Sequence, residues 1–365
     1  MTHRERFYKL FAFEPVDRIP LYYFGSWIET KERWVKEGFT GEVIRGDAGP
    51  QLPGMDPDWE VGLWNVQGLV ATGAIGDVAP GVLEENEKQY LYRNSLGRVD
   101  LVRKDGSSIP HTVTWPLEPT WESWEKFKRY LEPTPDRYTP GWEKMAEELN
   151  AADRVTTFMG GSFYGWLRDF MGVENLSYIM YDEPELLEEM VSAITDHFMI
   201  LMEPILKKVK FDFVYFFEDC CGADGPLFSP ACYKQFFHPY YKKLIDFYKS
   251  HGVPYALIDS DGLMEPLIPC WLESGFDILF PLEVGKWEAA PDKVREKFGD
   301  RVRILGGVDK RFMSAPEEEL RAHLLTRKAA ADAGGYLPIP DHRVPPEVSL
   351  KQMMTYIRVF REIFG

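Results

Sequence analysis

The chain has 365 residues, of which 45% are hydrophobic and 15% aromatic, so it can bury the core of one large domain or of two domains. It carries 42 Lys and Arg against 58 Asp and Glu, and this formal charge of −16 argues against nucleic acid and anionic membranes as partners. No hydrophobic run reaches the length of a membrane span, and the start lacks the apolar core of a signal peptide. The four cysteines show no disulfide or CxxC framework, so we expect free thiols in a cytoplasmic protein.

The first part of the chain predicts an N-terminal elaboration. Residues 2–13 have the pattern of an amphipathic helix, Arg18–Phe24 that of a strand, and a further helix should run to about Glu37. Residues 87–104 predict a β-hairpin, because β-forming residues flank a turn that contains Gly97. An antiparallel hairpin within a βα chain indicates an insertion or lid, which we place at about 40–115.

From about residue 120 the chain alternates between strands and helices. The strands are expected at 154–159, 211–217, 255–258, 277–283, 301–309 and 336–340. With the strand near residue 20 this gives seven, and an eighth is expected within 40–115. The pattern predicts a (β/α)8 TIM barrel with an N-terminal elaboration, forming a single domain over 1–365. A doubly wound sheet is the alternative, but the Gly-rich first turn typical of that fold is absent.

Acidic residues follow five of the six strands expected after residue 150. They are Glu218 and Asp219, Asp259 and Asp261, Glu283, Asp309, and Asp341 beside His342. A single Asp after a strand usually caps a helix. Five acidic ends around one barrel mouth would repel one another unless a divalent metal, a protonated acid or a cationic ligand were present. We therefore expect a functional site at this end of the barrel.

Several segments resemble the uroporphyrinogen decarboxylase superfamily, which also contains cobalamin- and coenzyme M-dependent methyltransferases. The similar segments are Glu218–Gly222, Leu227–Phe236, Asp259–Gly262, Gly275–Glu283, Leu305–Asp309 and Gly334–Pro346, together with the Arg18-Ile-Pro start. The resemblance implies a (β/α)8 barrel whose site lies at the carboxyl ends of its strands.

The methyltransferases of this superfamily carry a zinc triad, His-x-Cys after one strand and Cys after the last strand. In this chain the matching positions are Asp259, Asp261 and His342. The resemblance therefore implies a divalent metal, Zn²⁺ in the first place, held by these three residues. Because both thiolates are replaced by harder ligands, a methoxylated or methylamine substrate fits better than a thiol.

The first functional expectation is a methyltransferase that moves a methyl group between such a substrate and a corrinoid, as in methylcobalamin, supplied by a partner protein. Asp261 and His342 would be catalytic, and Glu283 and Asp219 would support them or transfer protons. The other side chains expected to contact the substrate are Tyr23, Trp27, Phe163 and Tyr164, which would form an aromatic pocket, and Asp309.

Two alternatives stay open. The decarboxylases of the superfamily have a His after the last strand, so His342 could be the general acid of a uroporphyrinogen-type decarboxylase. Those enzymes also carry an arginine-rich N-terminal motif for substrate carboxylates, whereas this chain has 22–27, Tyr-Tyr-Phe-Gly-Ser-Trp, at that place. The other alternative is a barrel that has lost its chemistry and binds a small ligand.

Overall fold

A six-stranded parallel sheet forms the centre of the molecule, with the strand order β12-β11-β10-β9-β6-β5. The computed structural model describes residues 1–23, 25–41, 50, 52–56, 68–104, 110–299 and 302–365. The strands are β5 (Thr157–Gly161), β6 (Phe213–Phe217), β9 (Tyr255–Asp259), β10 (Ile278–Leu282), β11 (Arg303–Val308) and β12 (Tyr336–Pro340). The six strands predicted beyond residue 150 are thus confirmed, with small shifts at their ends.

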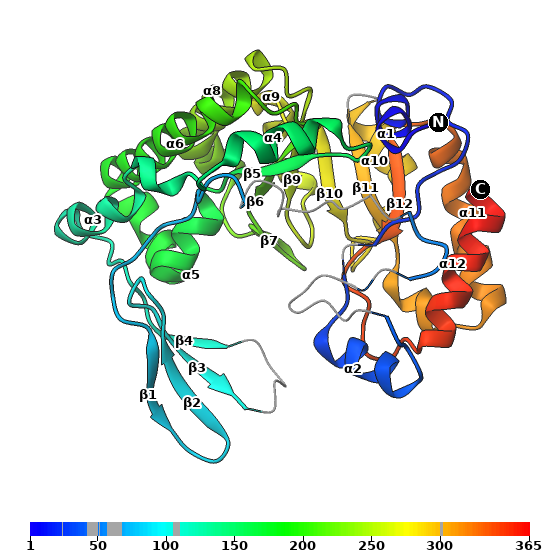
Figure 1. The fold of residues 1–365 in the computed structure, drawn as a ribbon, viewed down its shortest axis with the longest axis horizontal. Coiled ribbons are helices and arrows are strands. Elements are labelled where there is room, and N and C mark those ends of the chain that lie inside the picture. Colours follow the sequence, from blue (N-terminus) through cyan, green and yellow to red (C-terminus); the bar gives the residue numbers. More distant parts are fainter. Residues whose placement is uncertain (24, 42–49, 51, 57–67, 105–109, 300–301) are drawn as a thin grey trace.

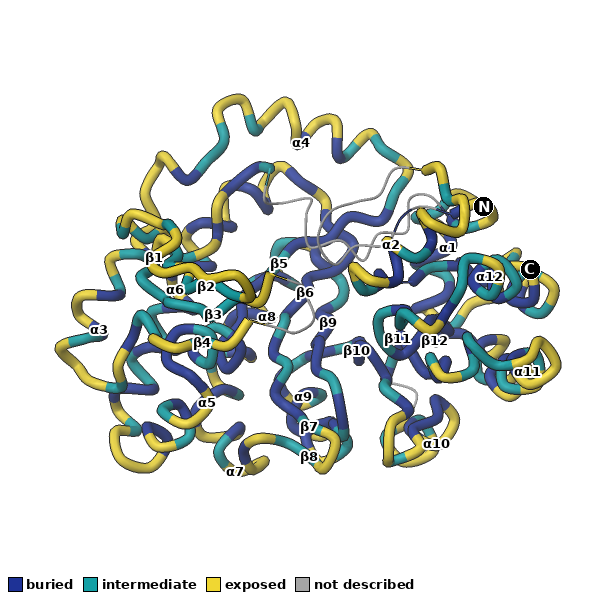
Figure 2. The backbone as a smooth tube through the Cα atoms, turned by 90° about the horizontal axis from the view of Figure 1, so that it is seen from below, coloured by how far each residue is buried: buried dark blue, intermediate teal, exposed yellow. Residues whose placement is uncertain are grey.

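Helices follow the strands and cover the outer side of the sheet (Figure 1). They are α5 (Tyr164–Asp182), α6 (Pro184–Leu206), α7 (Pro230–Cys232), α8 (His238–Ser250), α9 (Ile268–Ser274), α10 (Pro291–Phe298), α11 (Glu317–Asp332) and α12 (Leu350–Phe364). The strands have few polar residues because both of their faces are covered, as is usual for a parallel sheet in an α/β protein. Figure 2 shows the strands of the parallel sheet mostly buried, whereas the helices around them carry many exposed residues.

The alternation of strands and helices gives the TIM-barrel-like α/β fold that the sequence predicts. Within the described residues the sheet has six strands and does not close into a ring. The eighth strand was expected in 40–115, a range that lies partly outside the described residues.

The N-terminal segment lies beside the end of the last strand. After α1 (His3–Phe11), no strand is formed in the described part of the predicted strand 18–24, whose Phe24 lies outside the described residues. Instead, Ser26 forms a single parallel bridge with Val344 just before α2 (Ile28–Lys36). This contact brings a segment near the start of the chain to the carboxyl end of β12.

The predicted hairpin is confirmed and belongs to a larger antiparallel sheet of order β1-β2-β3-β4. Its strands are β1 (Gly81–Glu85), β2 (Gln89–Arg93), β3 (Val99–Arg103) and β4 (His111–Thr114). The sheet projects from the body (Figure 1), and α3 (Trp121–Phe127) and α4 (Trp142–Ala151) lead the chain back to β5.

The Trp115 ring anchors the base of this projecting sheet. It packs against Gly172 in α5, where a Cβ atom would lie only 2.8 Å from the ring and where φ is +84°. The Arg98 guanidinium lies 5.4 Å from the centre of the same ring. The sheet is therefore attached through an aromatic contact that only glycine permits.

Candidate active site

The carboxyl end of β9 carries the two aspartates that the sequence places at the centre of the site. Asp259 is the last residue of the strand and is buried, whereas the side chain of Asp261 is 39% exposed. Gly262 has φ +75°, and a Cβ atom there would lie 2.4 Å from the carbonyl oxygen of Gly222. The tight turn after Asp261 therefore requires glycine.

Asp261 and His342 meet, although they lie far apart in the chain. The Nε2 atom of His342 is 3.3 Å from Oδ2 of Asp261, and the His342 side chain is 19% exposed. The ring of Trp27 stacks on the imidazole with centroids 5.8 Å apart and an interplanar angle of 25°. The Arg343 guanidinium lies 5.1 Å from the centre of the Trp27 ring. Three separate segments thus form one cluster, which we call the dyad site.

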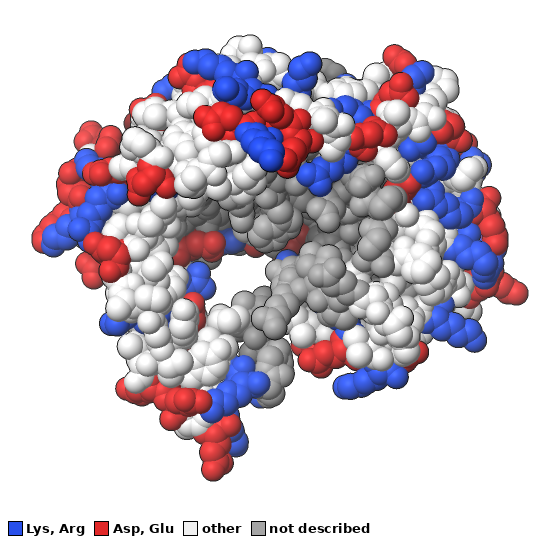
Figure 3. All heavy atoms as spheres, in the orientation of Figure 1, with Lys and Arg blue, Asp and Glu red and all other residues white. Residues whose placement is uncertain are grey.

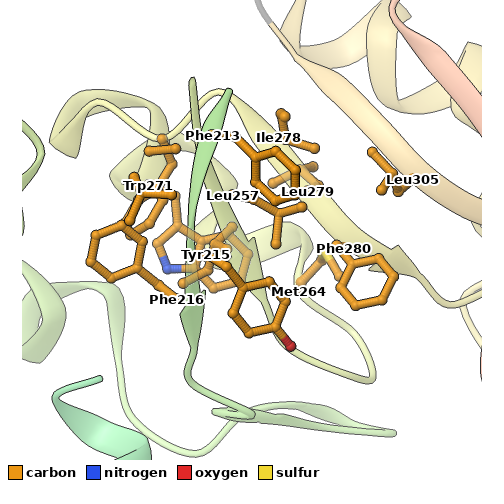
Figure 4. Close-up of a cluster of buried hydrophobic side chains, with 14 of the residues drawn as sticks. Phe213, Tyr215, Phe216, Leu257, Met264, Trp271, Ile278, Leu279, Phe280 and Leu305 are labelled. Atoms are coloured by element: carbon orange, nitrogen blue, oxygen red, sulfur yellow. The ribbon is translucent and has the colours of Figure 1, made fainter. Parts of the chain in front are cut away.

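Asp259 is directed toward the interior and bonds to Tyr215 of β6, whose hydroxyl donates to Oδ2 of the aspartate. Burial, and next the nearby charge of Asp261, raise the pKa of Asp259 well above its usual range. Figure 4 shows Tyr215 among buried hydrophobic side chains such as Phe280 and Met264. A protonated, neutral Asp259 is therefore compatible with this apolar surrounding.

Tyr215 was not predicted as a site residue. The available signal was a single hydroxyl in the hydrophobic strand sequence Phe-Val-Tyr-Phe-Phe, at 213–217. A buried tyrosine hydroxyl usually forms a hydrogen bond, so the presence of Tyr215 in this strand indicates a polar group on a neighbouring strand. Which strand provides that group depends on the register of β6 and β9, which pairs Tyr215 with Leu257.

The arrangement of the three expected metal ligands fits a metal ion only in part. Asp261 and His342 face each other, but Asp259 bonds to Tyr215. Among the described residues, no group of three or more His, Cys, Asp or Glu side chains is arranged to hold a metal ion. The zinc site thus stays a prediction from the resemblance. Stoichiometric zinc in the purified protein, lost in Asp261→Ala, would support it.

The acidic residues after β6 have other partners. Oδ2 of Asp219, at a residue with φ +41°, accepts a hydrogen bond of 2.8 Å from Nη1 of Arg168. Glu218 is buried and accepts hydrogen bonds from the backbone N–H groups of Phe163 (2.8 Å) and Gly165 (3.1 Å). The glutamate therefore provides hydrogen-bond acceptors for backbone N–H groups at the start of α5, which have no partner within the helix.

Only one of the predicted aromatic residues contacts the dyad site, and that residue is Trp27. Tyr23 is 4% exposed and its hydroxyl donates to the Pro50 carbonyl oxygen at 2.8 Å. Phe163 and Tyr164 are buried in the core, and the Phe163 ring lies 4.3 Å from that of Tyr241. In this conformation the structure brings neither Phe163 nor Tyr164 to an open surface.

Glu283 and Asp309 both line a pocket of about 300 Å³ beyond the ends of β9, β10 and β11. Glu283 accepts a hydrogen bond from the backbone N–H of Gly262 at 2.8 Å. Asp309 accepts two hydrogen bonds of 2.9 Å from Nε of Arg311. Neither Asp261 nor His342 lines this pocket. Glu283 and Asp309, two of the predicted site residues, therefore lie beside the dyad site and not in it.

Asp341, which precedes His342, also lines the pocket and connects three strand ends. Its carboxylate accepts hydrogen bonds of 2.9 Å from the backbone N–H groups of Val284 and Lys310. Burial raises its pKa to about 6. Asp341 therefore fixes the segment from which His342 projects.

The carboxyl ends of the strands, the projecting sheet and α2 lie on the same side of the molecule (Figure 1). In the same orientation, Figure 3 shows a hollow between the projecting sheet and the body.

Comparisons with known proteins agree with this architecture. Residues 118–363 match the sequence family described as Uroporphyrinogen decarboxylase (URO-D). A curated relative, uroporphyrinogen decarboxylase from Myxococcus xanthus, is 27% identical over 207 residues, which is 54% of this chain and 55% of the relative. The chain thus spans about half the length of this relative.

A solved structure, a methyltransferase from Methanosarcina mazei, superimposes with a TM-score of 0.59 and 16% identity over 99% of both chains. At this identity the likeness concerns the fold. The described helices include none with the length and hydrophobicity needed to cross a membrane.

Proposed function

Because the chain belongs to the uroporphyrinogen decarboxylase family, we propose that it is an enzyme of this family whose chemistry takes place at the dyad site. We propose further that it transfers a methyl group from a small methoxylated or methylated amine substrate to a corrinoid held by a partner protein. The observation that carries the proposal is the 3.3 Å contact between His342 and Asp261 at the carboxyl ends of the strands. This end of the strands is where enzymes of this fold class act.

In the proposed reaction His342 donates a proton to the substrate oxygen or nitrogen as its bond to the methyl carbon breaks. The electron pair of that bond stays on the oxygen or nitrogen. Asp261 orients the imidazole and stabilises its protonated form. Trp27 fixes the plane of the ring through the stacking contact. The corrinoid, when bound, supplies the nucleophile that accepts the methyl group.

The charge distribution supports a substrate that is neutral or cationic. The chain has a formal charge of −16, and carboxylates stand at five strand ends. The cation of Arg168 is engaged by Asp219. A substrate with many carboxylates would thus be repelled by the carboxylates that follow these strands.

The test measures methylcobalamin formation by its absorbance, with free cob(I)alamin as acceptor and a panel of methoxylated aromatic compounds and methylamines. We expect His342→Asn and Asp261→Asn each to lower kcat/KM by about 10²- to 10⁴-fold. His111→Asn, an exposed position on β4, is the matched control and should keep the wild-type rate. If His342→Asn also kept that rate, the dyad site would not be the catalytic centre.

A second candidate function is decarboxylation of a porphyrinogen, which the similarity to the Myxococcus xanthus uroporphyrinogen decarboxylase favours. His342 would then protonate the carbon that loses CO₂. Product analysis with uroporphyrinogen as substrate separates the two reactions. If the protein consumed neither substrate class, the remaining alternative would be a barrel that binds a small ligand and catalyses no reaction.

A further inference from the structure

The pocket beside the dyad site has its own charged groups, distinct from those of the proposed reaction. Its volume of about 300 Å³ lies at the lower end of the range for small-molecule sites. It is formed by the segments that follow β9, β10 and β11, with Ala223 and Asp341 completing its wall. A ligand of the size of an amino acid suits this volume.

The pocket lining contains three cations and three carboxylates. Two of the carboxylates are already engaged, because Arg311 binds both oxygens of Asp309 and two backbone N–H groups bind Asp341. This leaves Lys286, Lys310 and Glu283 as the groups that a ligand can reach.

The two lysines form long ion pairs, whereas Glu283 is held at Oε2 by the Gly262 N–H and presents Oε1 to Lys310. Lys310 Nζ is 3.3 Å from Oε1 of Glu283, with exposed fractions of 30% and 21% for the two side chains. Lys286 Nζ is 3.2 Å from Oδ1 of Asp224, and these side chains are 71% and 90% exposed. The Lys286–Asp224 pair is open to water and contributes about 0–1 kcal/mol, so a ligand can replace it at little cost. The Lys310–Glu283 pair is less exposed, but its 3.3 Å separation leaves room for a closer carboxylate on the lysine.

Opposite charges on one small wall match a ligand that carries both signs. A carboxylate placed between Lys286 and Lys310 would gain charge-assisted hydrogen bonds, and an ammonium group would gain one from Glu283. The Trp287 ring lines the same pocket and offers a surface for an alkylated cation. A simple anion would be repelled by Glu283 and by the acidic protein.

We propose that this pocket binds a small zwitterion, an α-amino acid or its N-methylated form. The carboxylate of the ligand is held by Lys286 and Lys310, and its cationic nitrogen by Glu283 beside Trp287. This site is separate from the dyad site, and the proposal does not depend on the proposed reaction.

The pocket is linked to the dyad site through two residues of the main chain. Gly262 follows Asp261 in the chain, and its N–H donates a hydrogen bond to Glu283. Asp341 precedes His342, and its carboxylate accepts a hydrogen bond from the Lys310 N–H. A ligand that moves Glu283 or Lys310 therefore acts on segments that carry both members of the dyad.

Isothermal titration calorimetry on the 365-residue chain tests the proposal, with L-alanine and glycine betaine as zwitterions and propionate and ethylamine as singly charged analogues. We expect one zwitterion to bind with 1:1 stoichiometry and at least tenfold more tightly than either analogue. Lys310→Met and Glu283→Gln should each weaken its binding about tenfold or more. The matched controls Lys293→Met and Glu296→Gln, exposed on α10, should bind like the wild type.

A further variant, His342→Asn, locates the binding. Wild-type affinity for the zwitterion in this variant supports a separate site, whereas loss of binding would place the ligand at the dyad site and overturn the proposal. Absence of binding by both zwitterions at millimolar concentration, or equal affinity for zwitterion and analogue in the wild type, would also overturn it. The comparison with the analogues uses only wild-type protein, so it tests the proposal even if a variant fails to fold.

Discussion

His323 on α11 should make the stability of the protein depend on pH in a defined range. Its Nε2 atom accepts a hydrogen bond of 3.0 Å from the backbone N–H of Asp309, so this nitrogen must be unprotonated. The Phe312 ring stacks on the imidazole with centroids 4.3 Å apart. Burial, and next the charge of Arg327, lower its pKa from 6.5 to about 4.

The sign of the effect follows from which state binds the proton. Between about pH 6.5 and pH 4 the unfolded chain protonates His323 while the folded protein does not, so acidification favours unfolding. A pKa difference of about 2.5, at about 1.4 kcal/mol for each pKa unit, is worth about 3 kcal/mol. Because the ring is partly exposed, we expect about 2 kcal/mol between pH 8 and pH 4.5.

Urea unfolding followed by tryptophan fluorescence at pH 8 and pH 4.5 measures this effect. The free energy of unfolding of the wild type should fall by about 2 kcal/mol more than that of His323→Gln, which has no imidazole to titrate. Leu325→Gln, at an exposed position of the same helix, is the control for a substitution on α11. An equal fall in the wild type and His323→Gln would refute the reasoning, as would an NMR titration that places the His323 pKa at its usual value.

Three further predictions concern the dyad site and the end of β9 beside it. Gly262→Ala should lower the free energy of unfolding by about 1–3 kcal/mol, measured by urea unfolding, because alanine is strained at φ +75° and its Cβ meets a backbone oxygen. Trp27→Leu should lower kcat in the methyl-transfer assay by about tenfold, with little change in KM, because it loosens the His342 ring; an unchanged kcat would contradict this role. Tyr215→Phe should destabilise the protein by about 1–3 kcal/mol in thermal unfolding, because Asp259 loses its buried donor; a gain in stability would contradict the assigned bond.

The central part of the fold could be predicted because strand and helix patterns alternate without interruption after residue 150. The hydrophobic run 213–217 and the proline-containing segment 336–340 have the length of buried strands, and both form strands. The segment 18–24 has the same composition, but its place depends on a distant partner. Ser26 meets Val344 in a single bridge, a tertiary contact that local propensity does not encode.

The candidate site was predicted in part for the same reason. Asp261 and His342 could be expected to meet, since parallel strands end at the same edge of the sheet. The direction of each carboxylate depends on its hydrogen-bond donor. Tyr215 donates to Asp259, and Arg168 donates to Asp219. These partners come from other strands and helices, so sequence spacing alone could not assign them.

The stacking of Trp27 on His342 has a consequence for biosynthesis. Trp27 and His342 lie far apart in the sequence, so the histidine is synthesised long after the tryptophan, yet the two rings stack in the folded protein. A polypeptide that ends before residue 342 therefore lacks the contact that completes the dyad site. The proposed chemistry should therefore require that the segment after β12 has been synthesised and has docked against Trp27.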